Sequence, residues 1–80
     1  MRTILCYGDS LTWGYTPVSG ARYPRDVRWT GVLARELGAC YEIIEEGLNG
    51  RTTAFDVFYN PNLNGAAHLE TELLTHAPLD

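Results

Sequence analysis

The sequence predicts an α/β fold with a parallel sheet, from two strand-like runs and a helical stretch between them. Residues 3–7 are continuously apolar or β-prone, and residues 41–45 contain three large apolar side chains. A run without polar alternation indicates a strand that is covered on both faces, which is typical of parallel sheets. Strand, helix and strand in this order form a βαβ unit, whose crossover is expected to be right-handed.

Two helices are predicted from apolar residues at helical spacing. The first has its apolar face at Trp29, Val32, Leu33 and Leu37, and the second at Ala66, Leu69, Leu73 and Leu74. Asp26 is expected to cap the start of the first helix, and Gly38 is expected to close its end. Asn64 is expected to cap the second helix, which runs to His76 before Pro78 stops it.

The charge balance limits the partners of the protein. A formal net charge of −4, with six Arg and no Lys, argues against nucleic acid, because phosphate binding needs a clustered positive face. Arg22, Arg25 and Arg28 are expected to pair with carboxylates at a subunit contact or on the surface, with anion binding as the alternative. No apolar run approaches the roughly 20 residues of a membrane span. The stretch at residues 4–7 is also too short for a signal peptide, so we expect a cytoplasmic protein.

The sequence shows no motif for a metal or a cofactor. Cys6 and Cys40 lack metal or redox spacing and are expected to be free, buried thiols, with a disulfide as the alternative. Glu42, Glu45 and Glu46 have no His or Asp at metal-ligand spacing, so we predict no metal. A dinucleotide-binding glycine motif and a phosphate-binding Lys are also absent.

The most informative stretch is Gly8-Asp9-Ser10-Leu11, directly after the first predicted strand. The carboxyl end of a parallel strand lies on the side of the sheet where ligands bind. Gly8 permits a tight turn, and the free N–H groups of a helical turn after Ser10 would point at whatever its hydroxyl attacks. Ser10 is therefore a candidate nucleophile, provided that a base reaches it. Asp9 is expected to accept hydrogen bonds around the turn.

This stretch resembles the first sequence block of the GDSL, or SGNH, hydrolases. In that family a second block follows the second strand, and its glycine lends a backbone N–H to the oxyanion hole. Gly50, within EGLNGRTT at residues 46–53, matches that glycine in position and context. Further likeness, to the bacterial arylesterase/acyltransferase branch, lies in DVRWTGVL at residues 26–33 and LNGA at residues 63–66. The resemblance covers essentially all 80 residues.

The resemblance implies a flavodoxin-like, three-layer α/β/α fold and a serine esterase without a cofactor. Ser10 would attack the ester carbonyl, and the N–H groups of Ser10 and Gly50 would bind the oxyanion. Substrates would be short-chain or aryl esters, with water or an alcohol as the acceptor, and this branch forms homo-oligomers. The residues expected to bind substrate are Leu11, Thr12, Trp13 and Asn49. Trp13 and Tyr15 either wall an acyl pocket or pack under the following loop.

The family's third and fourth blocks, Gly-x-Asn-Asp and Asp-x-x-His, do not occur in these 80 residues. His68 and His76 are expected to be solvated or to cap a helix rather than to act as the base. Residues 1–80 are therefore expected to be the N-terminal part of one hydrolase domain. A complementary C-terminal segment would supply the catalytic Asp and His. Arg51 is expected to hold the Gly50 loop by hydrogen bonds to carbonyl groups.

Two other functions remain open from the sequence. Residues 8–10 before a helix are a possible cradle for the phosphate of a flavin or nucleotide, as in flavodoxin-like sheets, although Asp9 would repel an anion. Alternatively, the chain alone is a catalytically inactive fragment.

We expect the isolated 80-residue chain to be unstable, because two strands and two helices leave open sheet edges and half-covered faces. Thermal denaturation followed by circular dichroism, with sedimentation to define the oligomeric state, tests this expectation. A cooperative transition of a monomeric chain would contradict it.

Overall fold

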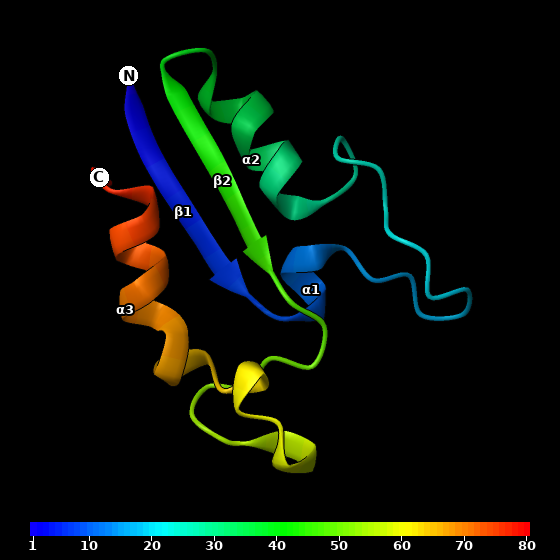
Figure 1. The fold of residues 1–80 in the computed structure, drawn as a ribbon. Coiled ribbons are helices and arrows are strands. Elements are labelled where there is room, and N and C mark those ends of the chain that lie inside the picture. Colours follow the sequence, from blue (N-terminus) through cyan, green and yellow to red (C-terminus); the bar gives the residue numbers. More distant parts are fainter.

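Strands β1 (Arg2–Gly8) and β2 (Tyr41–Gly47) pair in parallel, as the sequence predicts (Figure 1). The structure, a computed structural model, describes residues 1–80 apart from the side chain of Phe58. Helix α2 (Trp29–Leu37) connects the two strands, and helix α3 (Gly65–His76) follows β2. The predicted βαβ unit and the second helix are therefore confirmed, and both strands extend slightly beyond their predicted runs.

Short helical turns lie between these elements. Helix α1 (Ser10–Trp13) begins two residues after β1 ends, and it supplies the helical turn on which the role of Ser10 depends. Two 3-10 turns, η1 (Val57–Tyr59) and η2 (Pro61–Leu63), lie in the connection from β2 to α3. No helix among the described residues is long and apolar enough to cross a membrane.

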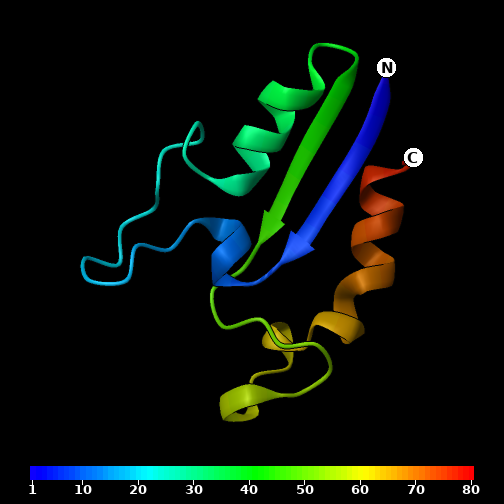
Figure 2. The ribbon, with the colours of Figure 1, turned by 180° about the vertical axis from the view of Figure 1, so that it is seen from behind.

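Helices α2 and α3 cover opposite faces of the sheet, which gives three layers (Figure 2). On one face, the Thr30 hydroxyl of α2 donates a hydrogen bond to Glu45 of β2. On the other face, the Tyr7 hydroxyl of β1 donates to the carbonyl oxygen of Gly65, at the start of α3, over 2.8 Å. Glu45 pairs with Cys6 in the parallel register, and Cys6 and Tyr7 point to opposite faces because they are neighbours in a strand.

The helix ends follow the predicted caps with one exception. Asn64 caps α3, since its Oδ1 accepts from the N–H of Ala67 over 3.2 Å, and Gly38 closes α2 with φ +85°. Asp26 does not cap α2, and that prediction is wrong. Both Val27 and Arg28 donate their backbone N–H groups to Pro24, so residues 24–28 close a separate turn before the helix. The N-cap of α2 is Arg28, without a side-chain cap.

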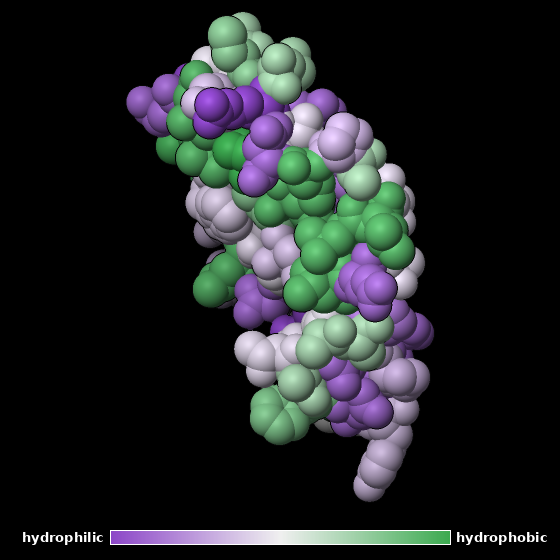
Figure 3. Space-filling model, turned by 90° about the vertical axis from the view of Figure 1, so that its left-hand side faces the viewer, coloured by the Kyte–Doolittle hydropathy of each residue, from purple (hydrophilic) through white to green (hydrophobic). Residues whose placement is uncertain are grey.

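The apolar core is small. Among the described residues, Cys6 and Ile43 are the buried apolar side chains, so the covering predicted for both faces of the strands is only partial. Both cysteines are free as predicted, but Cys40 is exposed rather than buried, because it lies in the turn that precedes β2. Figure 3 shows apolar side chains on the side of the molecule that carries α3, where Leu74 remains exposed.

Helix α1 packs directly on the end of the sheet. A Cβ atom added to Gly47, the last residue of β2, would overlap the backbone nitrogen and Cα of Trp13. A Cβ atom on Gly8 would overlap the Thr12 side chain in the same way. Glycine is therefore required at both strand ends for the backbone of α1 to approach them.

We predict that Gly47→Ala lowers the free energy of unfolding of the intact protein by about 1–3 kcal/mol, because α1 must move to admit the methyl group. Urea denaturation measures the change. Ala39→Ser, which also adds one heavy atom but in an exposed turn, serves as the control and is expected to leave the midpoint unchanged. Equal midpoints for Gly47→Ala and the wild type would contradict this close packing.

Candidate active site

Ser10 is the first residue of α1 and follows the carboxyl end of β1. Asp9 forms the N-cap: its Oδ1 accepts from the N–H of Leu11 over 3.0 Å. Its carbonyl oxygen accepts from the N–H groups of Thr12 and Trp13 over 3.1 and 3.0 Å. The structural role predicted for Asp9 is confirmed. The cap holds Ser10 at the start of the helical turn, where the backbone N–H of a residue has no partner inside the helix.

Gly50 lies in a tight turn that is attached to the end of β1. The turn is closed by the backbone N–H of Arg51, which donates to Leu48 over 3.1 Å, and Gly50 has φ +85°. The N–H of Leu48 donates to the carbonyl oxygen of Gly8 over 3.1 Å, two residues before Ser10. Within the described part of the chain, the N–H groups of Ser10 and Gly50 have no hydrogen-bond partner. Both donors therefore remain available near the same strand end.

Arg51 holds this loop by hydrogen bonds to carbonyl groups, as predicted. Its Nη1 donates to the carbonyl oxygens of Gly8, over 3.0 Å, and Glu46, over 2.6 Å. The guanidinium carbon lies 4.0 Å from the centroid of the Tyr7 ring, which is a cation–π arrangement. The connection from β2 is thus joined to both strands of the sheet.

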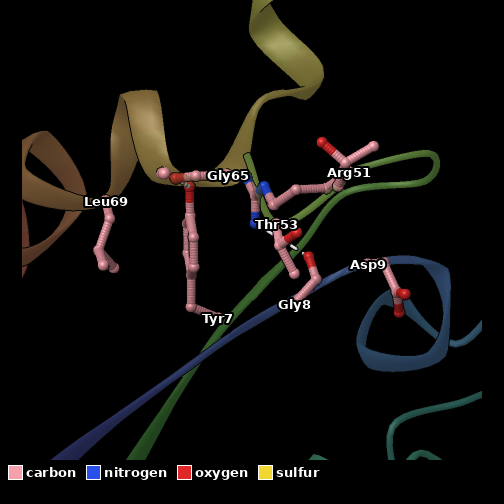
Figure 4. A pocket seen from close by; sticks show the side chains of 9 residues that line it. Tyr7, Gly8, Asp9, Arg51, Thr53, Gly65 and Leu69 are labelled. Carbon is pink, nitrogen blue, oxygen red and sulfur yellow. Dashed lines mark hydrogen bonds between the residues drawn. The ribbon is translucent and has the colours of Figure 1, made fainter. Parts of the chain in front are cut away.

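A pocket of about 400 Å³ lies beside this turn, at the carboxyl edge of the sheet (Figure 4). Its wall is made by the end of β1, by the residues after Gly50 and by the start of α3. The lining residues are Tyr7, Gly8, Asp9, Arg51, Thr52, Thr53, Gly65, Ala66 and Leu69. Ser10 is not among them, although its neighbour Asp9 is.

The four residues expected to bind substrate have different environments. Leu11 is 78% exposed, and Asn49 is exposed in the Gly50 turn. Thr12 is buried, and its hydroxyl oxygen accepts from Nε1 of Trp29 over 3.3 Å. Trp13 has the guanidinium of Arg22 over its ring, 5.0 Å from the centroid. The side chain of Thr12 thus serves packing, and a substrate role for these residues stays a prediction.

Glu45 pairs with two of the three clustered arginines. Its carboxylate, with 12% of the side chain exposed, lies 3.2 Å from Nη1 of Arg28 and 3.7 Å from Nη1 of Arg25. These two arginines pair with a carboxylate as expected, and the carboxylate belongs to the same chain. Arg22 instead donates from Nε to the carbonyl oxygen of Trp13 over 2.7 Å.

His76 lies in a cluster of ionisable groups that sequence reasoning missed. Its Nε2 is 2.8 Å from Oε1 of Glu46 and 3.6 Å from Oε2 of Glu72, and the three ligand atoms lie within 4.8 Å of one another. This is the set of described residues that could hold a metal ion. The inference that Glu46 lacks a metal-ligand cluster with a histidine is therefore wrong, because α3 packs on the face of the sheet toward which Glu46 points. The spacing of Glu72 and His76, one helical turn, was the available sequence signal.

Neither histidine contacts the hydroxyl of Ser10 within the described residues. Nε2 of His68 lies 3.0 Å from the carbonyl oxygen of Pro61, in the connection before α3. His76 is bonded to Glu46 as described, so it is neither solvated nor a simple cap of the helix. The arrangement thus contains a candidate nucleophile and two oxyanion donors, with no general base in contact with them.

Solved structures of esterases are similar to this chain in fold and sequence. The aryl esterase of M. smegmatis is 58% identical, with a TM-score of 0.93, over 100% of this chain and 39% of that chain. A carbohydrate acetylesterase from Sinorhizobium meliloti is 50% identical, with a TM-score of 0.95, over the same shares. A carbohydrate acetylesterase family member from that organism is 51% identical, with a TM-score of 0.90, over 100% and 38%.

The chain resembles these esterases along its whole length. It matches the N-terminal part of an esterase fold and spans about 39% of the length of the first two proteins. No protein-family model and no curated protein matches the chain.

The thiol of Cys6 has a pKa that is shifted from its ordinary value. Burial raises the pKa of Cys6, and the nearby carboxylate of Glu45 raises it further. Both causes disfavour the thiolate, which is the nucleophilic form of cysteine. Cys6 is thus kept in the neutral form under the α2 side of the sheet.

We predict that Ellman's reagent at pH 8 modifies Cys40 first and Cys6 at least about tenfold more slowly, because only Cys40 is exposed. Because the pKa of Cys6 is higher in the folded than in the unfolded protein, the free energy of unfolding is also expected to fall as the pH rises. This fall begins near the ordinary thiol pKa and is complete above the pKa of Cys6 in the folded protein. Cys40→Ser is expected to remove the fast phase. Equal labelling rates of the two thiols in the folded protein would contradict the burial of Cys6.

Proposed function

We propose that the intact protein is a serine esterase of the SGNH type that acts on short-chain or aryl esters. The observation that carries this proposal is the pair of unpartnered N–H groups, of Ser10 and Gly50, on two turns that meet at the carbonyl of Gly8. The similarity to an aryl esterase and to carbohydrate acetylesterases supports the same reaction class.

In the proposed reaction, Oγ of Ser10 attacks the ester carbonyl carbon while a base takes the hydroxyl proton. The carbonyl electron pair moves onto oxygen, and the N–H groups of Ser10 and Gly50 stabilise this oxyanion by hydrogen bonds. Collapse of the tetrahedral intermediate breaks the bond between the carbonyl carbon and the alkoxy oxygen, and the base returns its proton to that oxygen so that a neutral alcohol leaves. Water then attacks the acyl-enzyme and releases the acid, or an alcohol attacks it and yields a new ester.

The catalytic base and acid are proposed to come from residues outside these 80. His68 and His76 are bonded to Pro61 and Glu46 respectively, so neither accepts the proton of Ser10 in the described arrangement. Asp9 caps α1 through its carboxylate, and it precedes the nucleophile directly. The acid of a triad must lie behind the base, so Asp9 does not fit that role. We therefore propose that the isolated chain is inactive.

We predict that a fluorophosphonate probe labels the intact protein at Ser10 and abolishes hydrolysis of aryl acetates. Ser10→Ala is expected to lose labelling and to lower kcat by at least about 1,000-fold, because the nucleophile is removed. Peptide mass spectrometry locates the adduct, and hydrolysis of 4-nitrophenyl acetate measures the rate.

Ser19 offers a matched control, because Ser10 and Ser19 are the two serines of the sequence. Ser19 lies in an exposed turn, where its hydroxyl accepts a hydrogen bond from the N–H of Ala21 over 3.3 Å. Ser19→Ala should therefore retain full labelling and activity. An adduct at Ser19, or full esterase activity in Ser10→Ala, would show that the proposal is wrong.

A further inference from the structure

Arg51 links the carboxyl ends of both strands through a single nitrogen. Its Nη1 donates to the carbonyl oxygen of Gly8, the last residue of β1, over 3.0 Å. The same nitrogen donates to the carbonyl oxygen of Glu46, the penultimate residue of β2, over 2.6 Å. Because the donor is charged, each of these hydrogen bonds is stronger than one between neutral groups.

The orientation of the Arg51 guanidinium is fixed by its stacking on the Tyr7 ring as well as by its hydrogen bonds. The group lies over the ring of Tyr7, at 4.0 Å, and the Tyr7 hydroxyl is itself held by the carbonyl oxygen of Gly65 over 2.8 Å. Nε of Arg51 is buried and has no partner among the described residues. The side chain thus adopts this position although one of its donors remains unsatisfied. Its place is therefore determined by Nη1 and by the aromatic ring.

Gly50 lies between two residues, Leu48 and Arg51, that both donate hydrogen bonds to the carbonyl oxygen of Gly8. On one side of Gly50, the backbone N–H of Leu48 donates to the carbonyl oxygen of Gly8 over 3.1 Å. On the other side, Arg51 donates to the same oxygen from its side chain. Gly8 is joined to Ser10 through Asp9 alone, so the N–H of Gly50 is held in a defined place relative to the nucleophile.

We propose that Arg51 is a positioning residue that holds the Gly50 N–H where the oxyanion of ester hydrolysis forms. This inference rests on the proposed function. Arg51 acts through Gly50 and has its own guanidinium engaged by the two strands. Lys in its place would keep a charged donor but would lose the planar group that stacks on Tyr7.

The test compares Arg51→Met and Arg51→Lys with the wild type in the intact protein. Arg35→Met is the matched control, because Arg35 is exposed on α2 and lies 3.9 Å from Glu36 in a surface pair. The end point of fluorophosphonate labelling counts competent sites, and kcat for 4-nitrophenyl acetate is expressed per labelled site. This normalisation removes the effect of any molecules that fail to fold.

We expect Arg51→Met to lower kcat per site by about 10- to 100-fold with KM within about twofold, because a misplaced donor weakens transition-state binding. Arg51→Lys should recover part of the loss, and Arg35→Met should match the wild type. The rate of fluorophosphonate labelling should fall in parallel, since the phosphoryl oxygen needs the same donors. Thr30→Val, which removes the hydrogen bond to Glu45 on the α2 face of the sheet, should lower stability without changing kcat per site.

The outcomes separate the two proposals. A wild type whose Ser10 is not labelled ends the proposed function, and the role of Arg51 ends with it. A labelled wild type whose Arg51→Met variant keeps the wild-type kcat per site overturns the positioning role alone. An Arg51→Met variant whose effect is confined to KM also overturns it, as does an equal fall in kcat per site in Thr30→Val.

Discussion

The parallel register of β1 and β2 is the constraint on which the candidate site depends. Because Gly8 pairs with Gly47, both strands end at one edge of the sheet. The absence of side chains at these two positions lets α1 lie against the strand ends, and α1 begins with Ser10. A shift of one residue would carry the side chains of one strand to the other face and would separate Gly8 from Leu48.

Consecutive carboxylates of β2 fix the two outer layers to the sheet. Glu45 points toward α2, where Thr30 and Arg28 donate to it, and Glu46 points toward α3, where it contacts His76. A carboxylate that is largely withdrawn from water is costly unless it is paired and hydrogen-bonded. Few apolar side chains are buried, so these polar contacts are a large part of what joins both helices to the sheet.

Much of the candidate site could be predicted because its contacts are local. Asp9 caps the turn that contains Ser10, and Arg51 binds carbonyl groups next to its own loop, as the sequence suggested. Asp26 does not cap α2, because a turn closed by the carbonyl of Pro24 precedes the helix, and short-range cap patterns do not reveal such a turn. Residue type also suggested a buried Cys40, whereas its position in a turn leaves it exposed.

The sequence by itself determined the order of strands and helices, the cap of α3 at Asn64 and the identity of the candidate nucleophile, Ser10. These features depend on periodicity and on contacts within a few residues. Only the tertiary structure decided that Glu45 forms an ion pair with Arg28 and that His76 forms a hydrogen bond with Glu46, thirty positions away. Such pairs depend on how the helices cross the sheet, and sequence spacing does not encode that geometry.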